Sequence, residues 1–185
     1  MNNWYKKSKK IKPKKDESYG WTCVIVPDDI KEKILGFAKK IPERELYVEV
    51  GENGHSHGIE KDSHITALYG IITKNVKDVE SALKDHKGGK IKLGKIDVFE
   101  NEKYDVLKIN IISPSLHRIN SSLTECLDNV NEFPSYKPHI TIAYLKCGNG
   151  RKYVGDKFRG LSFDFDEIVF EDKNDKKYFV KLDCD

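Results

Sequence analysis

Two short stretches carry the residue types from which acid–base chemistry can be built. His64 and Thr66 lie in DSHITALYG, and His139 and Thr141 lie in the similar KPHITIAYL. Histidine exchanges protons near neutral pH, so one imidazole can deprotonate a nucleophile while the other protonates a leaving group. Threonine hydroxyls can donate hydrogen bonds to phosphate oxygens and stabilise the charge of a transition state. The pair therefore predicts a site for phosphodiester cleavage that needs no metal.

The two stretches are short, rich in β-branched residues and typical of strands. Side chains alternate along a strand, so His64 and Thr66 should share one face while Ile65 packs behind them. The second motif repeats this pattern. The same parity places Tyr69 and Tyr144, five residues after each histidine, on the opposite face, where we expect core packing. The alternative is that two ordinary strands carry edge histidines.

The other predicted elements must hold these two strands close together. We expect strands at residues 19–27, 45–50, 64–71, 91–100, 105–112, 139–145, 162–171 and 177–182, and helices at 28–41, 76–86 and 114–130. Because neighbouring strands are joined by connections too short for parallel crossovers, the sheets should be largely antiparallel and the fold class α+β. Each motif follows a helix-containing unit, which indicates two degenerate copies of one unit facing each other.

Composition indicates a soluble globular protein, and the lack of membrane and leader signals leads us to expect it in the cytoplasm. Of the 185 residues, 38% are hydrophobic and 34% are charged. No apolar run approaches the roughly 18 residues of a membrane helix, and no secretory leader is visible, so we expect no membrane partner. We expect a basic, disordered tail at residues 1–17 and a single domain at 18–185.

The net charge of +3 conceals an uneven distribution. The first 15 residues hold seven lysines and no acid, so the rest of the chain has 26 basic and 30 acidic side chains. Such a tail can attract nucleic acid through counterion release, or can be a solubilising segment only.

Neither cysteines nor glycines indicate a cofactor. The cysteines are widely separated, without zinc-finger spacing, and are expected to be reduced thiols. They are Cys23, Cys126, Cys147 and Cys184. The glycine-rich stretches match no Walker or dinucleotide motif. A metal site from His55, His57, His64 and Asp62 is the alternative, but no further ligand spacing supports it.

At the two His-Ile-Thr motifs the chain resembles the 2H phosphoesterase superfamily, whose two His-hydrophobic-Thr/Ser motifs lie on facing strands of a two-lobed, pseudo-symmetric α+β fold. The resemblance covers residues 18–183. It implies catalysis by His64 and His139 and phosphate binding by Thr66 and Thr141.

Longer stretches resemble a phage-encoded branch of that superfamily that contains anti-CBASS phosphodiesterases. These stretches are SYGWTCVIVP, FPSYKPHITIAYLKCG and FDEIVFEDKNDKKYFVKL. Enzymes of this branch degrade the cyclic oligonucleotides, such as cGAMP, that bacteria use as antiviral alarms. The resemblance implies that a ribose 2′-hydroxyl, activated by one histidine, attacks the adjacent 3′-5′ phosphodiester. The other histidine protonates the departing 5′-oxygen, and either histidine can take either role.

A cyclic nucleotide also requires contacts to its bases. Stacking on an aromatic ring is sequence-tolerant and contributes about 1–3 kcal/mol per base. Tyr19 is the leading candidate, and Trp21 should share its strand face. Glu167, on the late strand expected beside the second motif, could accept hydrogen bonds from a base or the 2′-hydroxyl. The alternatives are ordinary strand packing for the aromatic residues and a solvated side chain for Glu167.

Two other functions fit parts of the pattern. An enzyme of the same fold could process RNA ends, as a 2′,3′-cyclic phosphodiesterase or a 2′-5′ RNA ligase-like protein. A protein of another class could sequester nucleotides or RNA and use the lysine tail for affinity. The intact histidines and threonines argue against sequestration, because a binding protein needs no proton donor or acceptor.

Overall fold

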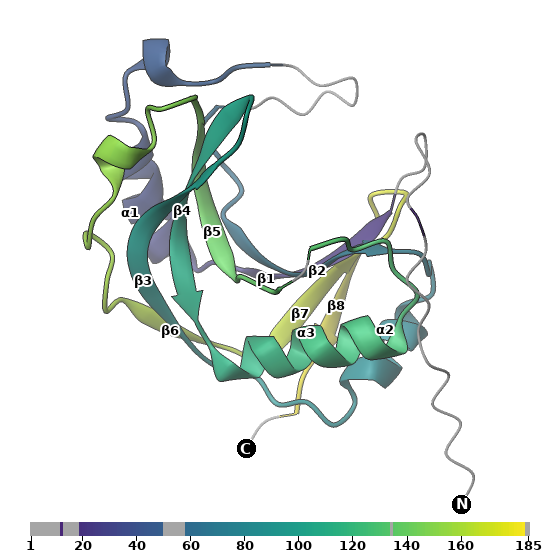
Figure 1. The fold of residues 1–185 in the computed structure, drawn as a ribbon. Coiled ribbons are helices and arrows are strands. Elements are labelled where there is room, and N and C mark those ends of the chain that lie inside the picture. The colour runs from purple at the N-terminus through teal and green to yellow at the C-terminus, as the bar shows by residue number, and fades with distance from the viewer. Residues whose placement is uncertain (1–11, 13–18, 50–57, 134, 184–185) are drawn as a thin grey trace, which may run out of the picture.

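The computed structural model describes residues 12, 19–49, 58–133 and 135–183, which form two four-stranded antiparallel sheets with helices packed against them (Figure 1). One sheet has the strand order β2-β1-β7-β8 and the other β5-β4-β3-β6. The strands are β1 (Gly20–Ile25), β2 (His64–Ile71), β3 (Gly89–Glu100), β4 (Tyr104–Ile112), β5 (His139–Lys146), β6 (Ser162–Phe165), β7 (Glu167–Glu171) and β8 (Lys177–Lys181). The helices are α1 (Asp28–Ala38), α2 (Val76–Leu83) and α3 (Pro114–Cys126), with short 3-10 turns η1 (Glu43–Glu45) and η2 (Arg151–Tyr153).

The helices begin where local sequence favours it. Asn75 accepts a hydrogen bond from the Lys77 amide at the start of α2, and Ser113 accepts one from the Leu116 amide at the start of α3. Pro114 then occupies the first turn of α3, where its missing N–H costs nothing. None of the helices in the described residues is long and apolar enough to cross a membrane.

Each histidine motif occupies an edge strand of its own sheet. β2 is the outermost strand of the first sheet and β5 is the outermost strand of the second, and these two strands contact each other. The free edge of β2 pairs with the loop around Asn129, and that of β5 pairs with short segments at Leu46 and Ile59. Edge strands in water invite pairing with other chains, so this coverage protects both motif strands.

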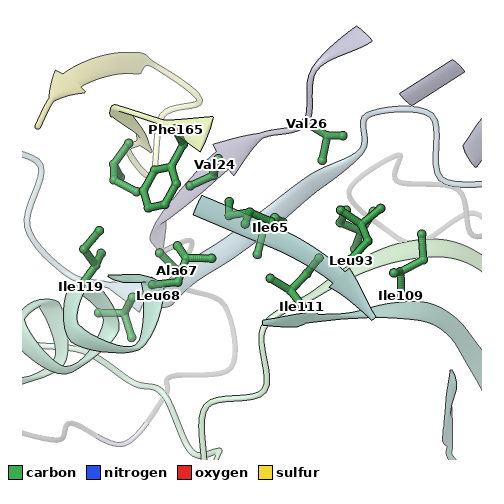
Figure 2. Packing of buried hydrophobic residues seen from close by; sticks show 14 of the residues in the cluster. Val24, Val26, Ile65, Ala67, Leu68, Leu93, Ile109, Ile111, Ile119 and Phe165 are labelled. Carbon is green, nitrogen blue, oxygen red and sulfur yellow. The ribbon is translucent and has the colours of Figure 1, made fainter. Parts of the chain in front are cut away.

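One continuous hydrophobic core joins the two sheets and the helices. Figure 2 shows Ile119 of α3 facing Ala67 and Leu68 of β2, while Ile109 and Ile111 of β4 belong to the second sheet in the same core. α3 also contacts α2, and α1 packs against β5. The predicted α+β, two-lobed fold is therefore confirmed, with the motif strands backed by a shared core.

Several sequence-based boundaries were wrong. Residues 45–50 were expected to form a strand, but Leu46 makes only an isolated bridge to Leu145 after η1. The single strand expected at 162–171 is two strands in different sheets, because the chain leaves the second sheet at Asp166: β6 pairs with β3, and β7 pairs with β1 and β8. α3 ends at Cys126 and not at 130, because Leu127 already has extended backbone angles.

Candidate active site

Both motif strands carry the same irregularity one residue after the threonine. Cys23 pairs with Thr66 but Thr22 pairs with Leu68, so Ala67 is an extra residue that forms a β-bulge. In β5 the pairing skips from Thr141 to Ala143 in the same way. A bulge shifts the alternation of side chains by one position. We call the side of each sheet from which its histidine and threonine project the motif face.

These bulges overturn the placement of the two repeated tyrosines in the core. Tyr69 pairs with Trp21 and is 52% exposed, and Tyr144 pairs with Val106 and is half-buried. After the bulge each tyrosine returns to the motif face. The parity argument was wrong because it assumed unbroken alternation over five residues.

The two imidazoles are held in the same way. His64 Nδ1 lies 2.6 Å from the carbonyl oxygen of Asp62, and His139 Nδ1 lies 2.7 Å from that of Lys137. A carbonyl oxygen only accepts hydrogen bonds, so each Nδ1 carries a proton and each Nε2 remains for chemistry. The carbonyl just before each histidine is also fixed, since it accepts from the Val26 amide in one lobe and the Ile111 amide in the other. The backbone therefore orients both rings.

His139 lies in an environment that disfavours its charged form. Burial lowers the pKa of His139 below its usual 6.5, and the positive charges of Lys108 and His64 lower it further, against the opposing hydrogen bond to the Lys137 carbonyl. The influence of His64 on this pKa reflects how near the two motifs lie. At neutral pH His139 is a free base that can accept a proton.

Sequence reasoning missed a buried lysine on the motif face of the second sheet. The Lys108 side chain is 4% exposed, pairs in register with Thr141, and donates a hydrogen bond to Asn110 Oδ1. Its Nζ lies 3.7 Å from Asp97 Oδ2 and 4.1 Å from the centre of the Phe99 ring. Lysine is almost never buried without a partner. Its place within the apolar run DVLKINII was the available signal.

A tyrosine in the loop before the second motif is hydrogen-bonded to the backbone of the first motif. Tyr136 donates its hydroxyl to the carbonyl oxygen of Thr66 at 2.8 Å, across 70 positions in sequence. Burial raises the pKa of Tyr136 far above its ordinary value of 10.0, so the phenol stays a donor. Asn120 of α3 donates to the carbonyl of the bulge residue Ala67 at 2.7 Å. Both bonds fix the backbone around Thr66.

The structure places the predicted aromatic residue Trp21 beside the first motif. The ring of Trp21 lies 4.9 Å from that of His64, and the ring of Phe99, which sequence reasoning missed, lies 5.1 Å from that of His139. Tyr19 is half-buried immediately before β1. Each lobe thus places one aromatic side chain against its histidine.

Glu167 does not lie beside the second motif. It starts β7, which belongs to the sheet of the first motif, and its carboxylate forms an ion pair with Lys181 at 3.1 Å. The expectation failed because residues 162–171 divide between the two sheets. The negative charge of Glu167 is therefore paired with the positive charge of Lys181, which lies directly opposite on β8.

Other predictions fall on residues that the structure does not describe. His55 and His57, on which the alternative metal site depends, are outside the described residues, as is all of the 1–17 tail except Lys12. Among the described residues, no group of three His, Cys, Asp or Glu side chains could hold a metal ion.

Comparison with known proteins agrees with this fold. A family model described as the 2′-5′ RNA ligase superfamily matches residues 59–177, more than half of the chain. No curated protein sequence matches. Among solved structures, TT0787 of Thermus thermophilus is similar over 89% of this chain and 95% of its own, with a TM-score of 0.60 and 15% identity. Apo E. coli LigT is similar over 90% and 95%, with a TM-score of 0.55 and 16% identity.

Proposed function

Because this chain belongs to the 2′-5′ RNA ligase superfamily, we propose that it is a metal-independent phosphodiesterase that opens the 3′-5′ bonds of cyclic di- or trinucleotides. The observation that carries the proposal is the duplicated hydrogen bond from each histidine Nδ1 to a backbone carbonyl. It leaves Nε2 of His64 and His139 available on the motif faces that also bear Thr66 and Thr141. This arrangement on two contacting strands supports one histidine as general acid and the other as general base.

The residues support an internal transfer reaction. One Nε2 removes the proton from a ribose 2′-hydroxyl, whose oxygen attacks the adjacent phosphorus as the bond from phosphorus to the 5′-oxygen breaks. The other histidine, protonated at Nε2, gives its proton to that departing oxygen. The products of this step are a 2′,3′-cyclic phosphate and a free 5′-hydroxyl. Thr66 and Thr141 donate hydrogen bonds to the non-bridging oxygens, where negative charge develops.

The aromatic residues favour a substrate with a base on each side of the cleaved phosphate. Trp21 lies against His64 and Phe99 lies against His139, one in each lobe. Stacking is available to any base because every base has a π-face. A cyclic dinucleotide such as cGAMP offers two bases, whereas a terminal 2′,3′-cyclic phosphate offers only one beside the reacting phosphorus. The proposed biological role is the removal of bacterial antiviral signals by a phage.

Processing of RNA ends is the second candidate, and the superfamily description favours it. One assay distinguishes the two candidates. Purified protein is incubated in EDTA with either cGAMP or a short RNA that ends in a 2′,3′-cyclic phosphate. Product masses identify each cleavage. We expect faster turnover of the cyclic dinucleotide. Faster opening of the RNA end would favour the second candidate, and binding without any product would favour sequestration.

A further inference from the structure

The two lobes differ in the row of residues that crosses each sheet through the motif threonine. In the first sheet the paired residues of this row carry no charge: Thr66, Cys23 and Val169. In the second sheet the equivalent row contains an ion pair: Thr141, Lys108 and Asp97. The two lobes therefore differ at the residue that pairs with the motif threonine on the neighbouring strand: it is the uncharged Cys23 in the first sheet and the charged Lys108 in the second.

The acid beside Lys108 is shared with a second lysine. Asp97 Oδ2 lies 3.7 Å from Lys108 Nζ and 3.8 Å from Lys95 Nζ, and it also accepts a hydrogen bond from Asn110 at 3.1 Å. One carboxylate therefore serves two ammonium groups. Because the Lys108 side chain is only 4% exposed, water screens its charge poorly.

This charge acts on His139 through direct neighbours. Phe99 packs under Lys108 and meets the His139 ring edge to face, with ring centres 5.1 Å apart. Asn110, which accepts from Lys108, pairs in register with His139. Lys108 and His64 act directly on His139, and Lys108 is itself flanked by Asp97, Lys95 and Lys137. All but one of them are cationic or become so on protonation.

We propose that Lys108 makes the two histidines inequivalent: its charge adds to the burial of His139 in keeping that imidazole neutral, so that His139 takes the proton of the attacking 2′-hydroxyl and His64 protonates the departing 5′-oxygen. The division of roles rests on the proposed function. Lys108 is a positioning residue in this scheme, because it acts on the reaction through the charge state of His139.

The direct test follows the imidazole signals by NMR as pH is changed, without any substrate. Lys108→Met should raise the pKa of His139, Lys108→Arg should leave it depressed, and Asp97→Asn should lower it further because the lysine charge is then less balanced. Cys23→Ala, at the matching position of the first lobe, should not move it. An unchanged His139 titration in both Lys108→Met and Asp97→Asn overturns the proposal, and Asp97→Asn carries the test if Lys108→Met does not fold.

The pH profile of kcat/KM tests the assignment of the base. In Lys108→Met the acidic limb should move to higher pH, so activity should fall several-fold more at about pH 5.5 than at about pH 8, with rescue by Lys108→Arg. An equal loss at every pH would mean that Lys108 contacts the phosphate, and would overturn the assignment. Absence of turnover on every nucleotide would overturn the proposed function, whereas the substrate-free titration tests the effect of Lys108 alone.

Discussion

Replacement of Tyr136 by phenylalanine tests whether the two motifs are mechanically connected. The Tyr136 hydroxyl donates to the Thr66 carbonyl oxygen at 2.8 Å in a largely desolvated setting, although the residue is only half-buried as a whole. Removing the donor leaves that oxygen without this partner, which costs about 1–2 kcal/mol because an unsatisfied buried acceptor loses its bond to water as well. For a chain of this size the melting temperature should fall by about 2–8 °C. Turnover should fall too, because the backbone that aims the Thr66 hydroxyl is released.

The measurement is urea unfolding and thermal melting of the wild type, Tyr136→Phe and Tyr69→Phe. Tyr69 is the matched control because it is also a tyrosine close to a motif in sequence but is 52% exposed, so loss of its hydroxyl should change stability by less than about 0.5 kcal/mol. If Tyr136→Phe is as stable and active as Tyr69→Phe, the reasoning about this hydrogen bond is refuted.

Further results are expected for other substitutions. Burial lowers the pKa of His139 in the folded protein, so below about pH 6.5 the unfolded chain binds more protons than the folded one. The free energy of unfolding should therefore decrease as the pH falls through the folded pKa. Urea unfolding of His139→Gln should show a weaker dependence on pH. Gly70→Ala should destabilise the fold by more than about 1 kcal/mol, since Gly70 has φ +85° and its added Cβ would lie 2.7 Å from a side-chain carbon. Gly36→Ala, in open space within α1, should stabilise it by about 0.5–1 kcal/mol in the same melts. Trp21→Ala and Phe99→Ala should each raise KM for a cyclic dinucleotide about five- to 100-fold if each ring stacks on a base; unchanged KM values would contradict the stacking.

The sequence was sufficient to predict the fold class and the pairing of motifs, because both depend on repeated local patterns. Strand alternation placed Ile65 and Ile140 in the core, where both are fully buried. The same alternation misplaced Tyr69, because a bulge depends on pairing with a neighbouring strand and leaves no mark on the residues themselves.

Non-local contacts also account for the other errors. The switch of sheets at Asp166 depends on which strand edges are free in the folded chain, so the apolar pattern of residues 162–171 could not show it. The burial of Lys108 could not be read from its own strand alone, since it is produced by Phe99, Asp97 and Asn110 from two strands. Sequence patterns thus located the chemistry but not the electrostatic difference between the lobes.

The most direct test of the account is cleavage of cGAMP in EDTA by the wild type, His64→Ala, His139→Ala and the double variant, with product masses recorded. General acid and base catalysis each contribute about 100- to 10,000-fold, so each single variant should lose at least about 100-fold in kcat while keeping its fold. The wild type should yield linear products. Wild-type rates in the folded double variant would contradict the central claim that His64 and His139 perform the chemistry.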